Sequence, residues 1–99
     1  MAQHDVFALA GEEILLLDCQ TDLLDDFGTR LVVPLRPIAQ APRGMPRLNP
    51  VFDLNGARYM MMTQQAGAIP RATLGQPIAN FMDHHERIIA AFDMLLTGV

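Results

Sequence analysis

The chain begins with two apolar runs separated by a short polar turn. Val6–Ala10 and Glu13–Cys19 both contain residues that favour strands, and Gly11 lies between them. The second run holds four consecutive apolar residues, Ile14–Leu17, which is typical of a strand buried on both faces. The pattern therefore predicts an antiparallel hairpin over residues 6–19.

A polar stretch, Gln20–Gly28, follows this hairpin and is expected to form a loop with a helical turn. Arg30–Leu35 then favours a third strand. Pro34 has no backbone N–H to donate, so we expect it at a sheet edge, a bulge or a strand end. Arg36–Pro50 contains four prolines, which disfavour regular helix and sheet and predict a long loop.

Residues 51–63 carry the clearest local signal in the chain. Val51–Leu54 and Arg58–Thr63 flank the dipeptide Asn55-Gly56, which favours a tight two-residue turn because both residues tolerate positive φ. A second hairpin is therefore predicted, with Met60–Met62 of its return strand packed in the core or in an interface. A short strand at about residues 68–74 follows.

The C-terminal segment has a different period. Apolar residues recur at positions 81, 88, 92 and 95, which predicts an amphipathic helix over residues 83–96. Asp83 and Glu86 have the spacing of a capping box, and Gly98 suits the residue that follows a helix. Strands followed by one helix predict a mainly β fold, a small and partly open barrel with the helix packed on it.

The length of 99 residues predicts a single domain, 1–99, with a modest core. Yet 51% of the residues are hydrophobic and only 18% are charged, which is generous for a small monomer. Part of the apolar surface is therefore expected to meet a partner, for which a second copy of the chain is a natural candidate.

The charges are unevenly distributed along the chain. Residues 1–35 hold seven acids and one arginine, whereas residues 36–71 hold five arginines and one acid. These groups could neutralise each other inside the fold, or they could form two surfaces of opposite charge. The net charge of −4 and the absence of lysine argue against a general nucleic-acid coat protein.

Composition also bears on compartment. Cys19 is the only cysteine, so the chain forms no internal disulfide, and we expect this residue to be a buried apolar side chain in a reducing cytoplasm. The N-terminus lacks the pattern of a signal peptide, and no apolar run is long enough to cross a bilayer. No membrane association is expected.

No catalytic, metal or cofactor site is expected from the motifs. The adjacent residues His84 and His85 would point about 100° apart on a helix, so they are interpreted as solvated residues of its first turn and not as metal ligands. The aspartates at positions 22, 25 and 26 are ordinary turn residues without the pattern of a calcium loop.

Three stretches carry a resemblance to a known family. Nearly end to end, the order and spacing of these stretches resemble the CcdB family, with small length differences near the N-terminus and in the proline-rich loop. The stretches are Asp18–Asp25 with Gly28 and Arg30–Leu35; Leu48–Val51 with Arg58–Thr63; and Leu74-Gly75 with Ile88–Leu96 and the ending Gly98-Val99.

The resemblance implies a small SH3-like barrel of the CcdB/MazF type that works as a homodimer and is not an enzyme. It implies the toxin of a type II toxin–antitoxin system, which binds the DNA gyrase A subunit and traps the gyrase–DNA cleavage complex. A CcdA-like antitoxin would neutralise the toxin and join it in repressing their operon. DNA would be contacted only indirectly, through gyrase or the antitoxin.

The resemblance also implies site residues. The end of the last helix and the loop after the second strand are expected to bind gyrase, and the last helix is expected to form the dimer seam. The gyrase set is Leu23, Asp25, Asp93, Thr97, Gly98 and Val99, and the dimer set is Phe92, Leu95 and Leu96. Thr97 stands where the well-known toxins have tryptophan, which stacks on an arginine of gyrase.

Two alternatives remain open. Thr97 allows a family member that keeps the dimer and antitoxin binding but poisons gyrase weakly or not at all. The MazF and Kid ribonucleases share the fold, so RNA cleavage is a further candidate, with the arginines of residues 36–71 as RNA contacts.

Overall fold

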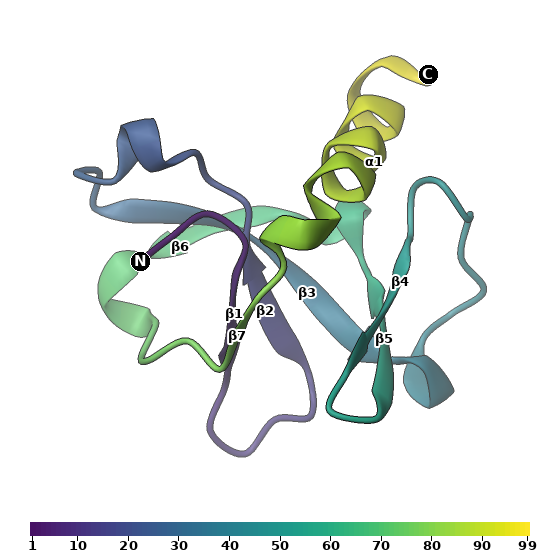
Figure 1. Ribbon diagram of the computed structural model, residues 1–99, viewed down its shortest axis with the longest axis horizontal. Helices are drawn as coiled ribbons and strands as arrows, with labels where there is room; N and C mark the ends of the chain where they lie inside the picture. The colour runs from purple at the N-terminus through teal and green to yellow at the C-terminus, as the bar shows by residue number, and fades with distance from the viewer.

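A computed structural model describes all residues, 1–99, as a curled half-barrel sheet with one C-terminal helix. The mainly β prediction is therefore confirmed. The strands run in the order β4-β5-β3-β2-β1-β7, and β6 also pairs with β3. Figure 1 shows the helix α1 standing at one side of the sheet, with its C-terminal half extending beyond the strands. The strands are β1 Asp5–Ala8, β2 Leu15–Asp18, β3 Thr29–Pro37, β4 Val51–Leu54, β5 Ala57–Met61, β6 Gly67–Pro70 and β7 Ala79–Asn80.

The first predicted hairpin forms from β1 and β2. The two strands pair antiparallel, with Phe7 opposite Leu16. All four residues of β2 are buried, as predicted for a strand covered on both faces. Leu15 and Leu17 point into the main core, whereas Leu16 joins Phe7 in a second, smaller core. Both faces of β2 are therefore covered by residues of the same chain, and no partner chain is needed to bury them.

Strand β3 is the centre of the sheet. It pairs with β2 along one side, while β6 and β5 share its other side. Pro34 lies opposite Leu16 inside this strand, so the expectation of an edge, bulge or strand end is wrong. The residue sits where the neighbour changes from β6, which ends its pairing at Val32, to β5, which begins at Leu35. The absence of a backbone N–H at Pro34 costs little free energy at such a junction.

The second predicted hairpin is also present. Strands β4 and β5 are joined by Asn55 and Gly56, which have φ values of 52° and 80°. Positive φ at both positions is what the tight turn requires. The methionines that follow are buried, and Met61 lies in the main core opposite Leu35, as predicted.

The loop between the third and fourth strands differs slightly from the prediction. Strand β3 continues to Pro37, and a single 3₁₀ turn, η2 (Ile38–Gln40), follows it. Residues 41–50 then contain no helix or strand. The predicted strand at residues 68–74 is shorter, because the 3₁₀ turn η4 (Arg71–Thr73) follows β6 directly.

The helix α1 spans His85–Thr97 and follows a 3₁₀ turn, η5 (Met82–His84). The predicted capping box is wrong, because the residue before the helix is His84 and no side chain caps it. The predicted end is confirmed, since Gly98 is left-handed, with φ 77°, and its N–H bonds to the Met94 carbonyl. None of the helices is long and apolar enough to cross a membrane.

Candidate functional site

The end of α1 carries several exposed apolar side chains. Ile88 and Ala91 are fully buried and attach the first half of the helix to the main core. Beyond them, Leu96 is 77% exposed and Val99 is 70% exposed. Figure 1 shows this part of the helix extending away from the sheet, with no other element beside its tip. The arrangement offers an apolar contact surface.

Local hydrogen bonds fix the last three residues. The Thr97 hydroxyl donates to the Asp93 carbonyl over 2.7 Å and accepts the Val99 N–H over 3.4 Å. Together with the left-handed Gly98, these bonds close the helix. Thr97 therefore acts here as a capping residue. The Asp93 carboxylate is exposed and makes no hydrogen bond or ion pair within the chain.

The residues expected at a dimer seam fall into two kinds. Phe92 is half-buried and packs against the main core of its own protomer. Leu95 is 40% exposed, and Leu96 is exposed further still, so these two side chains have little to cover them within one chain. The apolar stripe thus continues from the core out onto the open face of the helix.

The loop after β2 carries the other two expected contact residues. Leu23 lies in the 3₁₀ turn η1 (Asp22–Leu24) and is 91% exposed. Asp25 is instead held by the protein, because its carboxylate pairs with Arg30 at 3.2 Å and with Arg71 at 3.7 Å. Arg71 also donates to the Asp25 carbonyl. Asp25 thus anchors the loop that presents Leu23.

A buried ion pair lies beneath this loop. Arg30 is completely buried, and its Nε and a terminal nitrogen contact the same Asp18 carboxylate oxygen at 2.8 and 2.7 Å. Burial raises the pKa of Asp18, and the hydrogen bond from Arg30 opposes this rise. In the sequence, this ion pair was indicated only by the position of Asp18 at the end of an apolar run, and that position did not identify Arg30 as its partner.

The two parts of the expected gyrase surface do not meet in one protomer. Figure 1 shows η1 and the C-terminus at opposite sides of the molecule. Leu23 and Asp25 therefore cannot form a continuous patch with residues 97–99 of the same chain. A surface that uses both parts would need a second protomer or a partner that spans the distance.

Comparison with models of known protein families identifies the family of the chain. A model of the CcdB protein family matches residues 3–98. The chain belongs to the CcdB family. It is accordingly a toxin of a toxin–antitoxin system.

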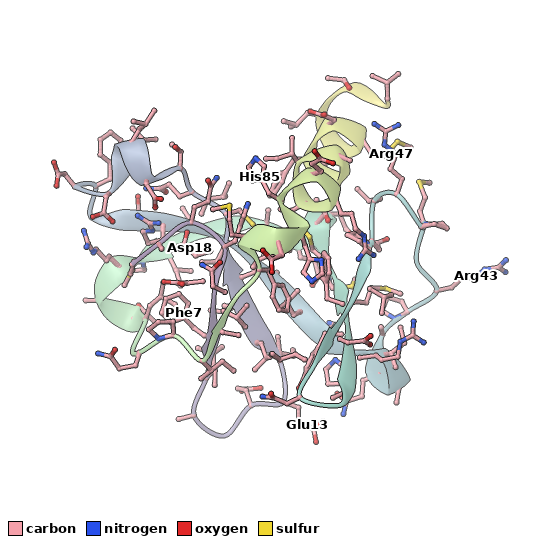
Figure 2. All side chains as sticks on the ribbon, viewed as in Figure 1. Phe7, Glu13, Asp18, Arg43, Arg47 and His85 are labelled. Atoms are coloured by element: carbon pink, nitrogen blue, oxygen red, sulfur yellow. The ribbon has the colours of Figure 1, made fainter.

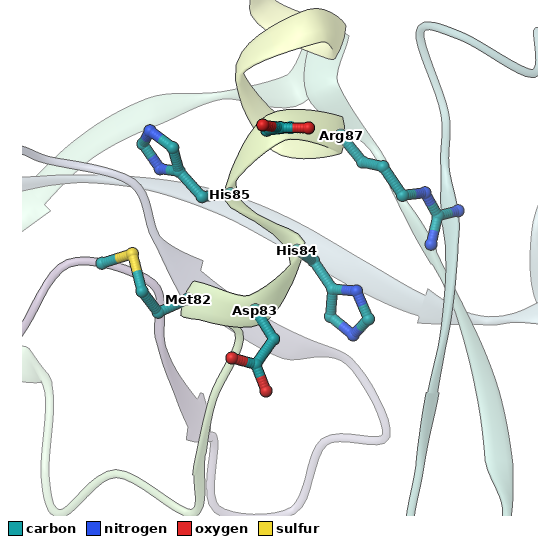
Figure 3. A pocket seen from close by; sticks show the side chains of 6 residues that line it. Met82, Asp83, His84, His85 and Arg87 are labelled. Atoms are coloured by element: carbon teal, nitrogen blue, oxygen red, sulfur yellow. The ribbon is translucent and has the colours of Figure 1, made fainter.

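The turn η5 and the start of α1 in this CcdB-family toxin line a cavity of about 490 Å³. Figure 3 shows His84 and His85 directed to opposite sides of the chain. No three side chains of the kinds that bind metals converge there or elsewhere in the structure. The cavity is open, and Met82 is the one apolar residue among those that line it.

His84 and His85 are half-buried, so they are less solvated than predicted. His84 lies against the rings of Phe52 and Phe81, with centroids 4.8 and 5.4 Å away. His85 Nδ1 lies 2.7 Å from Nε2 of His4, which is completely buried. Burial lowers the pKa of His4, and the neighbouring His85 lowers it further. His4 and His85 are 81 residues apart in the sequence, so the sequence pattern did not reveal their contact.

Cys19 is buried, as expected, and is not activated. Its Sγ lies 3.7 Å from the Leu17 carbonyl. Burial raises the pKa of the thiol, and the neighbouring Asp18 raises it further, so the reactive thiolate is disfavoured. The side chain acts as part of the core.

The arginines of residues 36–71 divide into two groups. Arg58 pairs with Asp53 at 3.6 Å, and Arg71 pairs with Asp25. Arg36, Arg43 and Arg47 have no carboxylate within ion-pair distance, so neutralisation inside the fold is wrong for these three.

Proposed function

We propose that this toxin acts in the cytoplasm as a homodimer that binds the DNA gyrase A subunit and traps the gyrase–DNA cleavage complex. A CcdA-like antitoxin would neutralise it, and the toxin itself would catalyse no reaction. The observation that carries this proposal is the projecting apolar end of α1, where the side chains of Leu96 and Val99 are mostly exposed. Family membership supplies the class of toxin.

The geometry of the helix end supports a docking role. Val99 follows a closed helix terminus, so its side chain is presented on an ordered backbone. Burying one such aliphatic side chain in a partner contributes about 1.5 kcal/mol or more. Asp93 adds an exposed charge one turn earlier, which can select a basic group on the partner.

The proposal is tested by incubating the full chain with gyrase from the same organism, ATP and supercoiled plasmid. Detergent and protease treatment should then release linear DNA. Val99→Glu should abolish this product, because it places a charge in the proposed interface. Ile78→Glu changes a side chain that is 49% exposed elsewhere on the molecule, and it should cleave as the wild type does. Intact plasmid with wild-type toxin at micromolar concentration would refute the proposal.

A second candidate is a family member that poisons gyrase weakly, and Thr97 is the observation that favours it. The hydroxyl of this residue is used within the helix end and offers no aromatic surface to a partner. Thr97→Trp should strengthen gyrase binding about tenfold, since an aromatic–guanidinium contact contributes about 0.5–2 kcal/mol. Titration calorimetry would measure the gain. Unchanged affinity would mean that this toxin makes the contact with other residues.

A further inference from the structure

The three asparagines of the chain differ in how the fold holds their side-chain amides. The amide nitrogen of Asn49 donates to the Met61 carbonyl over 3.0 Å, and its oxygen accepts a backbone N–H over 3.1 Å. The amide nitrogen of Asn80 donates to the Asp5 carboxylate over 3.0 Å, and its oxygen accepts the Met82 N–H over 2.8 Å. Both amides are therefore fixed on both of their polar atoms.

Asn55 is the exception. It forms the two-residue turn between β4 and β5 together with Gly56, and both residues are exposed. The hydrogen bonds of the chain leave the Asn55 amide and the Gly56 N–H without a partner. Apart from its chain neighbours, no heavy atom lies within 4 Å of the point where a side chain would begin at Gly56. The amide and the neighbouring backbone nitrogen are thus both free and open to water.

A free asparagine amide beside a free glycine nitrogen can react within the chain. The Gly56 nitrogen attacks Cγ of Asn55, and the new C–N bond closes a succinimide ring. The bond between Cγ and Nδ2 breaks, and ammonia leaves with the proton of the Gly56 nitrogen. Water then opens the ring, either at Cγ to give aspartate or at the main-chain carbonyl to give isoaspartate. Glycine favours the attack because no side chain shields its nitrogen.

The residues that follow the other two asparagines disfavour this reaction. Asn49 precedes Pro50, whose nitrogen carries no hydrogen that could leave with the ammonia. Asn80 precedes Phe81, whose N–H donates to the His4 carbonyl over 2.8 Å. The attacking nitrogen is therefore missing in one case and occupied in the other.

The turn has to rotate before the attack, because its φ values of 52° and 80° hold one conformation. The end of the hairpin can supply this freedom. Ala57 and Arg58 are exposed as well, and the nearest ion pair, between Arg58 and Asp53 at 3.6 Å, lies at the surface. Exposed pairs contribute little free energy, so opening this end leaves the core intact.

We propose that Asn55 is a site of spontaneous modification, at which the folded toxin converts into an aspartate and an isoaspartate form with water as the only co-reactant. Figure 1 shows the turn at the end of the molecule opposite the C-terminus, so the modification does not depend on gyrase binding. Of the residues in the chain, the Asn55 amide and the Gly56 nitrogen alone combine the reactive groups, the exposure and the lack of hydrogen bonds.

The two products differ in their effect on the hairpin. Aspartate tolerates positive φ and keeps the turn. Isoaspartate lengthens the main chain inside a turn whose register places Leu54 opposite Ala57, so the end of the hairpin has to open. Either product adds a carboxylate near Asp53, and Figure 2 shows Glu13 at the same end of the molecule. The added negative charge further disfavours the compact hairpin end.

The test incubates the full chain in warm, mildly alkaline buffer, since base removes the proton from the attacking nitrogen. Trypsin then cleaves after Arg47 and Arg58 and releases residues 48–58. This peptide contains both Asn49 and Asn55, so it carries its own control. Chromatography and mass spectrometry should resolve the original peptide and two heavier forms of equal mass, with the change located at Asn55. Asn49 and Asn80 should remain amides.

Two variants separate the chemistry from its consequence. Asn55→Gly is the matched control, because a Gly-Gly turn also accepts positive φ but has no amide to lose, and its peptide should stay unchanged. Aged wild type should unfold at a lower urea concentration than fresh protein, whereas aged Asn55→Gly should not shift. Asn55→Asp introduces the charge without lengthening the main chain, so it should unfold closer to fresh wild type than the isoaspartate form does.

Two results would overturn the proposal. One is an intact Asn55 in the folded toxin after an interval that converts the isolated peptide of residues 48–58. The other is equal conversion at Asn80, because the free amide and the free glycine nitrogen would then not select the site.

Discussion

Arg30 connects a buried strand to the loop that follows it through two ion pairs. Its side chain is the largest that is fully buried in the protein, and it joins Asp18 of β2 to Asp25 of the following loop. The sequence predicts the strand that carries Arg30, but not its burial. A strand alternates its side chains between two faces, and the partner of a buried charge depends on the register of another strand.

Removing one side of this pair should be costly. Arg30→Met leaves Asp18 buried without its counter-charge, and we expect the free energy of unfolding to fall by about 3–5 kcal/mol. Urea denaturation followed by circular dichroism would measure the change. Arg58→Met, at an exposed pair, should cost no more than about 1 kcal/mol. The double variant Arg30→Met with Asp18→Leu should recover part of the loss, and equal losses at both arginines would contradict the assignment.

At the scale of elements, the sequence predicts a turn or a helix end correctly where the residues at that position determine the local structure. The turn at Asn55 and Gly56 and the helix end at Gly98 were predictable because they depend on φ preferences of single residues. The start of α1 was not predictable from Asp83 and Glu86. There, packing of His84 against two phenylalanine rings and the contact of His85 with His4 replace a side-chain cap.

The contact between His4 and His85 makes the base of α1 sensitive to acid. The pKa of His4 is lowered from its ordinary value near 6.5, so the unfolded chain binds this proton more readily than the folded protein does. The corresponding stability is complete above about pH 6.5 and is lost as the pH falls below that value. A hydrogen bond to the backbone of Asp18 and, less strongly, the charge of Asp22 oppose this lowering of the His4 pKa without reversing it.

Urea denaturation at a series of values between about pH 7 and pH 5 would measure this loss. His4→Asn should reduce the dependence on pH, and asparagine tolerates the φ of 69° at this position. Equal slopes for the wild type and the variant would contradict the role of His4.

At the scale of the whole molecule, the architecture could be predicted because local residue preferences define the order of strands and turns, whereas the cavities could not be predicted. A cavity beside Arg87 is built from a loop, a strand edge and a helix that are distant in sequence. The apolar surplus, by contrast, was visible in the composition. Part of it lies on the outer half of α1, where Leu95 and Leu96 remain exposed, and part lies elsewhere, for example at Leu23 and Phe27.

Burial of this outer half by a second copy predicts a dimer. Light scattering should give a mass near twice 10.9 kDa at micromolar concentration. Leu95→Glu should shift the protein towards the monomer, because a charge in a symmetric seam meets its own copy. Ile78→Glu, at a comparably exposed site, should remain dimeric. A monomeric wild type would contradict the prediction.

The anchoring of the loop by Asp25 has a consequence for recognition. Arg30 and Arg71 hold both the side chain and the carbonyl of this residue, so the turn that presents Leu23 is ordered before any partner arrives. A rigid contact loses less conformational entropy on association than a flexible one. Asp25 can therefore influence the affinity of a complex without touching the partner, because the loop it anchors needs less ordering on association.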